Sequence, residues 1–519
     1  APQAQAPMDP HSFSAGFFLS LFAFSACQKA VPSSGHILIT DYGAVGDSAT
    51  LNTKAIQTAI DQAEKKGGGT VTIPPGVFMS GTIFLKSNVT LEVQGGATLL
   101  GSPNIEDYTK LSWGHNKDRQ PWHLIVAKEQ NNVRIIGNGM IDGNGPAFWT
   151  EDAEKDEKGN YVAPRWILAK DKKVSPLIQF EHCENVRLED FSVKTGGGWN
   201  IHLFNSKNIK ISGLDIVNNL YSPNSDGIDI NGSQDVIISD CYIRTCDDAI
   251  CLKASPLAME TKRVTVTNCI METLCVGLKM GASESFHDMS DITISNCVIF
   301  GSSRAIGMYS FNGSTYRNIN ISNIVANTNS PMVLNRPIHM QIERWEDTTQ
   351  IGKIEDVTIS GFTCETDGRI LLSAADGTAI ENLTLRDVTL KYAWIEDPAP
   401  IAAKAKSRQF PNKDKHPELL AAPAAIAAEN INNLRIENLQ VIWPSTEEVP
   451  LAWQHPERIE NGSLAVRKPV YDKVKQTEMN VLWGKNLNGG YLRSFDLKAS
   501  SNDLKKYLLK ESNISVNDF

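Results

Sequence analysis

The chain lacks several features that would place it in a broad class at once. Its N-terminal apolar segment, residues 12–26, falls short of the ~20 residues that a membrane-spanning helix needs. Basic residues are outnumbered, with a net charge of -9 over 519 residues, which argues against nucleic acid or an anionic membrane as the main partner. The nine cysteines and ten histidines show no metal-ligand spacing, and no glycine-rich loop leads into a helix. We therefore expect no metal and no cofactor.

A β-rich repeat runs through most of the chain. Stretches of alternating apolar residues begin at 185, 208, 235, 263, 291 and 318, so successive starts differ by 23, 27, 28, 28 and 27 residues. Val, Ile and Thr dominate and the apolar period is two, which excludes helical repeats. Weaker copies begin at 88, 132, 356, 382 and 433. The pattern predicts an all-β fold, a single-stranded parallel β-helix of about ten coils.

The segment before the repeat predicts a capping helix. Asn52 is the expected N-cap, Lys65, Lys66 and Gly67 end the helix, and its apolar face comprises Ala55, Ile56, Ala59, Ile60 and Ala63. Such a helix covers the core that the first coil of a solenoid exposes. We expect one domain over 36–519, with a surface excursion at 395–430 and late coils and a C-terminal cap at 445–519.

Two ladders of like residues recur at the repeat period. Cys241, Cys269 and Cys297 are predicted to pack as small interior hydrophobes, and Asn268, Asn296 and Asn323 to bond one another at a turn. Disulfides along the cysteine ladder are the less favoured alternative, since an odd total leaves at least one cysteine unpaired.

Three aspartates occupy corresponding places on neighbouring coils. Asp226 lies in NSDGIDI, and Asp247 and Asp248 lie in CDDAICLK. Asp226 and Asp248 are 22 residues apart, close to one short coil, so they are expected to be neighbours on one face. Only a bend or bulge would let Asp247 project into the same groove. Clustered carboxylates indicate acid/base chemistry or a metal site.

These stretches carry a family resemblance. DYGAVGD with NTKAIQTAI, IDGNG at 141, NSDGIDI and CDDAICLK resemble the pectin-lyase-like right-handed β-helix, and specifically glycoside hydrolase family 28, the polygalacturonases. The resemblance runs from about Ile37 to beyond residue 330. It implies inverting hydrolysis of glycosidic bonds in a pectic polysaccharide or oligosaccharide, with Asp247 as general acid and with Asp226 and Asp248 activating water. Each aspartate alone would be read as a turn cap, whereas three at the family's spacing favour catalysis.

The departures from the family concern substrate recognition. Val276 stands before Gly277 where the family usually has histidine, and Gly307, Met308 and Tyr309 replace its Arg-Ile-Lys. Losing that arginine and lysine removes the expected partners of a galacturonate carboxylate. Simple polygalacturonan is therefore in doubt, and a rhamnogalacturonan-type substrate is an alternative.

Other side chains can take over substrate binding. The predicted substrate-binding residues are Asn224, Lys253, Gly277, Lys279, Arg304 and Tyr309. Lys279 is the favoured cation because it lies two residues after Gly277 and can share its face, although a solvated lysine on the outer sheet is an equal alternative. Arg336 and Arg344 are further cations, and His339 is expected to be structural.

Two inserts, 112–124 and 147–168, carry tryptophans that could wall a groove. Trp113, Trp122, Trp149, Trp166 and Trp199 could stack on sugars, although burial is the commoner fate of a tryptophan. Walls at one end of a groove favour exo action.

The N-terminal apolar segment resembles a bacterial lipoprotein signal ending in FSAC, which implies a lipid anchor at Cys27. No Lys or Arg precedes the apolar run, and Phe24 stands where leucine is usual. Ordinary signal cleavage and a non-native N-terminus are the alternatives. We expect a monomer exported to the bacterial periplasm or anchored as an outer-membrane lipoprotein, with secretion as runner-up and residues 1–35 outside the folded domain.

Two other functions stay open at this point. A β-helix polysaccharide lyase would need a basic residue to abstract a proton, often with Ca²⁺ held by the aspartates. A non-catalytic carbohydrate-binding or adhesive β-helix is compatible with the missing His, Arg and Lys.

Overall fold

The protein is described by a computed structural model. It covers residues 36–112, 119–150, 167, 169–330, 335–392, 401–404, 416–444, 448–451, 464–467, 472–498 and 505–517. These residues belong to one compact unit, Gly35–Phe519. The predictions for residues 1–35 with Cys27, for Trp113 and Trp166, and for most of 147–168 and 395–415 fall outside the described residues.

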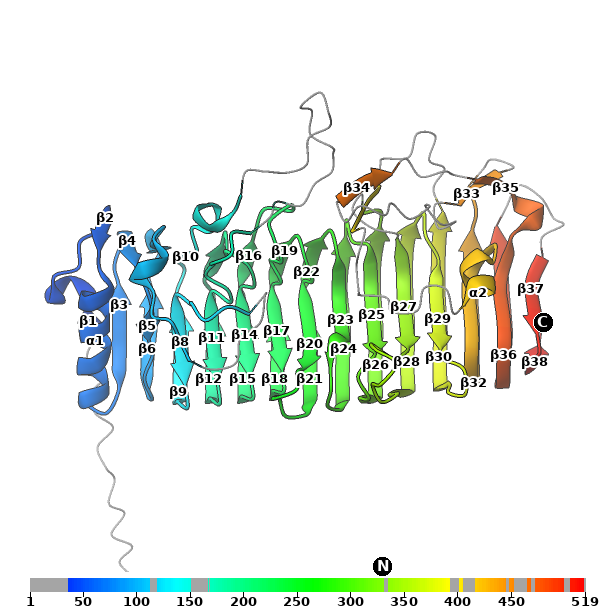
Figure 1. The fold of residues 1–519 in the computed structure, drawn as a ribbon, viewed down its shortest axis with the longest axis horizontal. Coiled ribbons are helices and arrows are strands. Elements are labelled where there is room, and N and C mark those ends of the chain that lie inside the picture. Colours follow the sequence, from blue (N-terminus) through cyan, green and yellow to red (C-terminus); the bar gives the residue numbers. More distant parts are fainter. Residues whose placement is uncertain are drawn as a thin grey trace, which may run out of the picture. The chain divides into compact units, whose positions relative to one another are not determined.

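The described chain folds as a right-handed parallel β-helix, which confirms the predicted fold class (Figure 1). Each coil contributes one strand to each of three parallel ladders. Successive strands of a ladder pair directly, as in Val236↔Val264 and Val264↔Ile292. Equivalent residues of successive coils therefore stack along the axis.

The first ladder contains the strands that the sequence repeat predicted. It also includes β1 and β3 before the predicted copies and β36 and β38 after them. Its strands are β1 (His36–Leu38), β3 (Gly69–Ile73), β6 (Val89–Val93), β9 (Asn131–Ile136), β12 (Glu184–Glu189), β15 (Lys207–Ser212), β18 (Gln234–Ser239), β21 (Thr261–Thr267), β24 (Met289–Phe300), β26 (Thr315–Thr328), β28 (Lys353–Thr366), β30 (Ile380–Tyr392), β32 (Ala424–Ile442), β36 (Asn480–Lys498) and β38 (Asn513–Asn517).

The second ladder follows directly after the first in each coil. From β24 onward its strands merge with those of the first ladder into long strands such as β26 and β28. Its separate strands are β2 (Asp47–Leu51), β4 (Gly76–Ser80), β7 (Ala97–Gly101), β10 (Met140–Asp142), β13 (Ser192–Lys194), β16 (Asp215–Val217), β19 (Tyr242–Thr245) and β22 (Ile270–Thr273).

The third ladder carries the three aspartates, and we call it the site ladder. It continues into β32, β36 and β37 (Lys505–Lys510). Its other strands are β5 (Ile83–Phe84), β8 (Ile125–Lys128), β11 (Ile178–Glu181), β14 (Ile201–Phe204), β17 (Ile228–Asn231), β20 (Ile250–Ala254), β23 (Val276–Ser285), β25 (Arg304–Ser310), β27 (Arg336–Ile342) and β29 (Ile370–Ala374).

The remaining elements are short. Two antiparallel pairs join β31 (Ile401–Lys404) to β34 (Leu464–Arg467) and β33 (Glu448–Leu451) to β35 (Asp472–Lys475). The helices are α1 (Thr53–Lys65), α2 (Pro417–Ala421) and the 3-10 turns η1 (Ile39–Tyr42), η2 (Ile105–Asp107), η3 (Gly145–Phe148) and η4 (Gln476–Glu478). Among the described residues, no helix combines the length and apolarity that a bilayer crossing requires.

Helix α1 is the predicted cap at the N-terminal coils (Figure 1). It buries Ile56, Ala59, Ile60 and Ala63 and ends at Lys65, as the sequence predicted. Asn52 is the N-cap residue, as predicted, but its side chain makes no cap hydrogen bond. It accepts a hydrogen bond from the Val45 backbone N–H at 2.7 Å instead, because the incoming chain folds back onto it.

The two predicted residue ladders lie at turns and in the core. Cys241, Cys269 and Cys297 are buried thiols in the free state, as expected for interior packing. Asn323 donates to Asn296 at 3.2 Å, whereas Asn268 donates to Asp240 at 3.3 Å. All three asparagines have positive φ, the left-handed conformation that asparagine tolerates at tight turns.

Candidate active site

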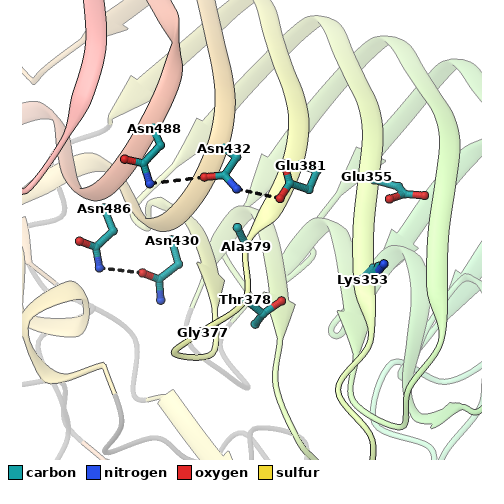
Figure 2. Close-up of a pocket in the computed structure, with 10 residues that line it drawn as sticks. All are labelled: Lys353, Glu355, Gly377, Thr378, Ala379, Glu381, Asn430, Asn432, Asn486 and Asn488. Carbon is teal, nitrogen blue, oxygen red and sulfur yellow. Dashed lines mark hydrogen bonds between the residues drawn. The ribbon is translucent and has the colours of Figure 1, made fainter.

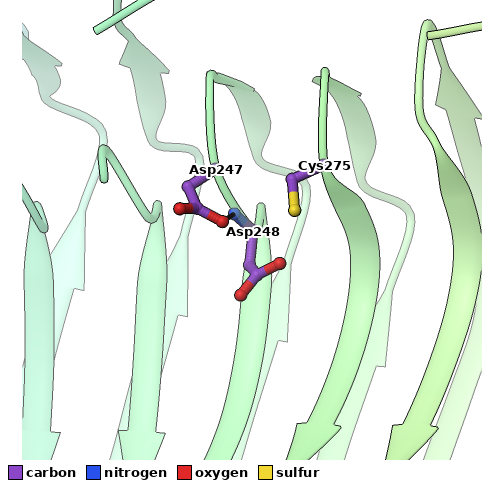
Figure 3. A group of neighbouring side chains, drawn as sticks. All are labelled: Asp247, Asp248 and Cys275. Carbon is purple, nitrogen blue, oxygen red and sulfur yellow. Dashed lines mark hydrogen bonds between the residues drawn. The ribbon is translucent and has the colours of Figure 1, made fainter. Parts of the chain in front are cut away.

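The three aspartates converge at the entrance to two neighbouring strands of the site ladder. Asp226 precedes β17, and Asp247 and Asp248 lie in the connection between β19 and β20. The pairing Ile228↔Ile250 extends backwards to place Asp226 opposite Asp248. One oxygen of each of Asp247 and Asp248 and the Cys275 sulfur all lie within 4.8 Å of one another (Figure 3). The chain therefore makes the bend that the sequence required.

Alternation within each strand explains which side chains reach the site. Ile228 and Ile230 of β17 belong to the core, so Asp229 and Asn231 project from the other face. The same alternation turns Lys253 of β20 outward. All residues of β17 and β20 are buried, so this face is also covered.

Each of two aspartates has its own lysine. The Lys279 ammonium lies 2.5 Å from Asp248 Oδ2, and the Lys253 ammonium lies 3.3 Å from Asp226 Oδ2. Asp247 instead accepts hydrogen bonds from the Asn224 side-chain amide at 3.2 Å and from the Asp248 backbone N–H at 3.0 Å. The three carboxyl groups thus have different electrostatic surroundings.

Burial governs the protonation of these acids. Asp226 is 3% exposed and Asp248 is 1% exposed. Loss of solvation raises the pKa of Asp226 well above its usual value, against the opposing effect of Lys253. Burial likewise raises the pKa of Asp248, with Lys279 opposing it. Burial therefore favours the protonated form of both carboxyls, and a lysine beside each opposes it.

The two predicted lysines differ in exposure. Lys279 is 13% exposed at its side chain and contacts Asp248, so it is not a solvated lysine of the outer sheet. Burial alone would lower its pKa, but Asp248 raises the pKa well above the usual range, and the ammonium stays charged. Lys253 is enclosed and contacts carboxylates on several sides.

A small pocket adjoins Asp248 on its C-terminal side. Its lining combines the thiol of Cys275 with two cations and a phenol, and consists of Asp248, Cys275, Val276, Lys279, Ala282, Arg304 and Tyr309. Val276 pairs with Arg304, and Arg304 pairs with Arg336 on the next coil. Cations therefore follow the acids at the same place in successive coils.

Tyr309 takes the space beside Gly307. A Cβ added at Gly307 would lie 2.8 Å from the Tyr309 ring, so glycine is needed for the ring to lie there. His339 packs edge-on against Tyr309, with 5.0 Å between ring centroids, and is fully buried, which fits the expected structural role. Burial and Arg336 lower the pKa of His339 well below its usual value, so this histidine is neutral.

Arg336, on the coil after Arg304, has a like charge as its neighbour. The Arg336 guanidinium lies 3.2 Å from ring nitrogens of His339. Burial, together with the neighbouring charge of Arg304, lowers the pKa of Arg336 to about 9. An anion bound here would relieve this unfavourable environment.

Three other predicted residues have packing roles. An added Cβ at Gly277 would lie 2.5 Å from Ile299, so this position faces the core and has no side chain to offer the groove. Trp199 is 4% exposed beneath Lys253, so it takes the buried position that was the alternative to stacking on sugar. Trp149 is also buried, and Trp122 is partly exposed between Lys110 and Lys172.

Asp247, Asp248 and Cys275 are the only group of described residues close enough together to hold a metal ion. Their chemistry does not favour one. The Lys279 ammonium already contacts Asp248, and burial raises the pKa of the Cys275 thiol well above its usual value. A protonated thiol is a poor ligand.

The face of the site ladder is covered at both ends. On the N-terminal side, Arg119 lies 4.4 Å over the Phe204 ring and 3.4 Å from Glu181. On the C-terminal side, Leu419 of α2 packs in one cluster with Leu371 and Trp483. The aspartates and arginines lie on the strands between these covers.

A second pocket lies at turns of later coils (Figure 2). Its asparagines bond along the stack, since Asn488 donates to Asn432 at 3.4 Å, Asn432 to Glu381 at 2.8 Å and Asn486 to Asn430 at 2.9 Å. These bonds link one coil to the next, so we interpret the side chains as turn structure.

Two residues at the site were not predicted from the sequence. Asp229 lies within NSDGIDI and alternates with Ile228 and Ile230, so its outward direction was available as a signal. Glu284 reaches Lys253 through a bulge in β23, and no local sequence pattern signalled that bulge.

Comparison with known proteins finds relatives that are named as galacturonosidases and polygalacturonases. It is 32% identical over 254 residues to the exo-poly-alpha-D-galacturonosidase of Dickeya chrysanthemi, covering 41% of each chain. It is 31% identical over 251 residues to a probable polygalacturonase of Vitis vinifera, covering 46% of this chain and 48% of the relative. The alignments thus span less than half of either relative.

Two solved structures share the fold. The Thermotoga maritima exopolygalacturonase gives a TM-score of 0.61 at 20% identity, covering 79% of this chain and 92% of that one. The Yersinia enterocolitica family 28 exopolygalacturonase gives 0.59 at 22% identity, covering 78% and 75%. The family model described as glycosyl hydrolases family 28 matches residues 65–408, more than half of the sequence. The chain therefore belongs to glycosyl hydrolase family 28.

Proposed function

We propose that this protein is an inverting exo-acting glycoside hydrolase that removes galacturonate-containing units from pectic chains. The observation that carries the proposal is the convergence of Asp226, Asp247 and Asp248 at one edge of the site ladder in a chain of this family. Names of relatives such as exo-poly-alpha-D-galacturonosidase support a galacturonate substrate.

The roles of the aspartates follow from their surroundings. Asp247 donates a proton to the leaving oxygen, and Asp226 and Asp248 orient and deprotonate the attacking water. Lys253 and Lys279 favour the ionised form of Asp226 and Asp248, as a base requires. Asp247 is held by the Asn224 side-chain amide and by the Asp248 backbone N–H, which position its carboxyl beside Asp248.

The cations beside Asp248 replace the family's missing Arg-Ile-Lys. Lys279 pairs with Gly307, so it lies one coil earlier at the place where the family has its cationic motif. Arg304 lines the same pocket. Together they supply charge-assisted hydrogen bonds to a uronate carboxylate. A galacturonate next to the cleaved bond therefore fits this chain in spite of the substituted motif.

Exo action is supported by the covered ends of the face. Arg119 with Glu181 and Phe204 covers the face before Asp226, and α2 covers it after Arg336. A chain end fits between two such covers better than the middle of a polymer.

Product analysis tests the proposal. The protein and its Asp247→Asn variant are incubated with polygalacturonan, rhamnogalacturonan and other plant and algal oligosaccharides. Saturated mono- or disaccharides should appear first, from the parent protein alone, and proton NMR should show inversion at the anomeric carbon. Unsaturated products that absorb in the ultraviolet would indicate a lyase, and binding without turnover would indicate a carbohydrate-binding β-helix.

Export as a lipoprotein is a separate proposal, supported by the FSAC motif at Cys27. Labelled palmitate should be incorporated by the protein in a bacterial host and not by a Cys27→Ser variant. Labelling of neither would exclude the anchor.

A further inference from the structure

Lys253 lies at the centre of an ion-pair cluster behind the carboxylates. Its ammonium is 3.3 Å from Asp226, 3.0 Å from Asp229 and 3.3 Å from Glu284. On another side it lies 3.3 Å from the centroid of the Trp199 ring. The side chain is 3% exposed. An ammonium so enclosed does not reach a sugar, so the expected role of Lys253 in substrate binding does not fit this geometry.

A bulge delivers Glu284 to this cluster. Leu252 pairs with Met280 and Ala254 pairs with Ser285, so residues 281–284 stand opposite Lys253 alone. Within the bulge, Gly281 has φ +75° and Ala282 has φ 77°. Alanine rarely adopts this conformation, and bulges that keep strained residues cluster next to active sites. Without the bulge, β23 would carry no carboxylate to Lys253.

The carboxyl of Asp226 depends on a nearby cation. Asp226 Oδ1 is buried and has no hydrogen-bond partner among the described residues. Burial raises the pKa of Asp226, and Lys253 is the group that lowers it most. Asp229, Asp247 and Asp248 raise it further. The charged or titratable groups packed around this cluster are His202, Asp229, Asp247, Asp248, Lys253, Lys279 and Glu284.

We infer that Lys253 is a positioning residue that favours the ionised form of the Asp226 carboxyl and holds it in place, and that Asp229 and Glu284 hold Lys253 against it. The inference rests on the proposed function, in which Asp226 serves as a base. The pH at which kcat/KM falls on the acid side of the pH–rate profile then depends on Lys253, although this residue does not touch the substrate.

A purely structural role for Lys253 makes a different prediction. Asp229 is fully buried, with the Lys253 ammonium 3.0 Å away, so Lys253 could serve only to neutralise Asp229. In that case the double variant Lys253→Met/Asp229→Asn, which removes one positive and one negative charge, would restore the wild-type profile. If Lys253 acts on Asp226, the double variant keeps part of the defect, because Lys253 lowers the pKa of Asp226 more than Asp229 raises it.

The experiment measures kcat/KM against pH for the full chain and its variants on the substrate that the product analysis identifies. Lys253→Met should move the acid limb upward by on the order of 1–3 pH units. The double variant should move it upward by less, because it also lacks the Asp229 charge that raises the pKa of Asp226. Lys253→Arg keeps the charge and should keep the limb near its original pH. Lys262→Met is the matched control, because Lys262 pairs with Glu260 at 2.8 Å on the adjacent strand β21 and is 28% exposed.

A wild-type acid limb in the double variant would overturn the inference, and so would an unmoved limb in Lys253→Met. Should Lys253→Met fail to fold, the better-balanced double variant and Lys253→Arg still decide the question.

A second readout separates this inference from the proposed function. Carbon-13 NMR of protein labelled at the aspartate carboxyls follows the titration of Asp226 without any substrate, with the signal assigned by Asp226→Asn. The midpoint should rise in both Lys253→Met variants. If no glycan is hydrolysed but the midpoint rises, the proposed function fails while the control of Asp226 by Lys253 stands. An unmoved midpoint overturns the inference whatever the turnover.

Discussion

Two parts of the site ladder have the same backbone and opposite charge. On β17 and β20 the residues that enter the strands are Asp226 and Asp248, and at the same register β25 and β27 begin with Arg304 and Arg336. Val276 of β23 occupies the same register between the two pairs of strands and carries no charge. We call the first pair of strands the acid side and the second pair the arginine side. Asp248 and Arg304 are therefore two coils apart, which is roughly 9.6 Å along the axis at about 4.8 Å per coil.

The two sides manage their charge differently. On the acid side, Lys253 and Lys279 contact carboxyls, so that two cations offset part of the buried negative charge within the protein. On the arginine side, Arg336 has a lowered pKa because burial and Arg304 act together. The acid side thus places cations beside its carboxyls, whereas the arginine side places two like charges on neighbouring coils.

Asp247→Asn, on the acid side, should cause the largest loss of activity. Asparagine has no proton to donate to a leaving oxygen, so kcat should fall by about 10²- to 10⁴-fold. The measurement is initial-rate kinetics, with thermal unfolding as a check that the fold is retained. Asp240→Asn is the matched control, because Asp240 is exposed at a turn with φ 58° and should tolerate asparagine without loss of rate. Equal losses in both variants would contradict a role specific to Asp247.

Arg304→Met, on the arginine side, should cause a smaller loss of activity. Loss of a charge-assisted hydrogen bond should lower kcat/KM roughly tenfold to hundredfold on a uronate substrate. On the methyl-esterified substrate, which carries no carboxylate charge, the variant and the parent should differ little. Arg317→Met is the control, because Arg317 pairs with Asp288 at 2.9 Å away from the site ladder and is 38% exposed. An equal loss on both substrates would exclude recognition of charge.

The core of these coils was predictable because one rule governs it. Inward residues such as Val236, Val264 and Ile292 repeat at the coil period, and stacking them requires only apolar side chains of similar size. The strand positions, the α1 cap and the cysteine packing followed from that rule. The carboxylate cluster followed as well, since equivalent positions of adjacent coils must meet.

The outward contacts were less predictable because they depend on departures from the repeat. The bulge that brings Glu284 to Lys253 inserts residues into one strand only, and no periodicity reports it. The enclosure of Lys253 by Trp199 joins residues far apart in the sequence, so a lysine predicted to meet sugar meets an indole. The Tyr309 ring over Gly307 likewise depends on side-chain direction.

His416 precedes α2, which covers the arginine side, and should make the stability of the protein decrease at alkaline pH. This histidine lies 2.7 Å from Glu429 and 3.6 Å from Glu343. Burial alone would lower the pKa of His416, but the two glutamates raise it to about 9 from 6.5. A raised pKa in the folded state stabilises the protein below pH 6.5, and this contribution is lost as pH rises through about 9.

The test compares thermal unfolding of the parent and His416→Gln across this range. The variant should be less stable near pH 6, and the gap should close by about pH 9, the pKa of His416 in the fold. His36→Gln is the control, since His36 is exposed and lies 3.9 Å from Glu92. A gap that stays constant with pH would mean that His416 contributes by packing alone.

The smallest effect should come from the turn scaffold that both sides share. Asn268 lies on the coil of β20 and Asn323 on the coil of β25, and both are exposed with φ near 55°. Replacing either by alanine should cost about 1–2 kcal/mol of unfolding free energy because a Cβ without a polar side chain disfavours left-handed backbone. Glycine at either position should cost less, since it adopts this conformation freely. Denaturant unfolding measures the cost, and kcat/KM should not change in any of the four variants. Because the two turns are equivalent while the outward side chains are not, unequal rates would mean that the backbone itself differs between the acid and arginine sides.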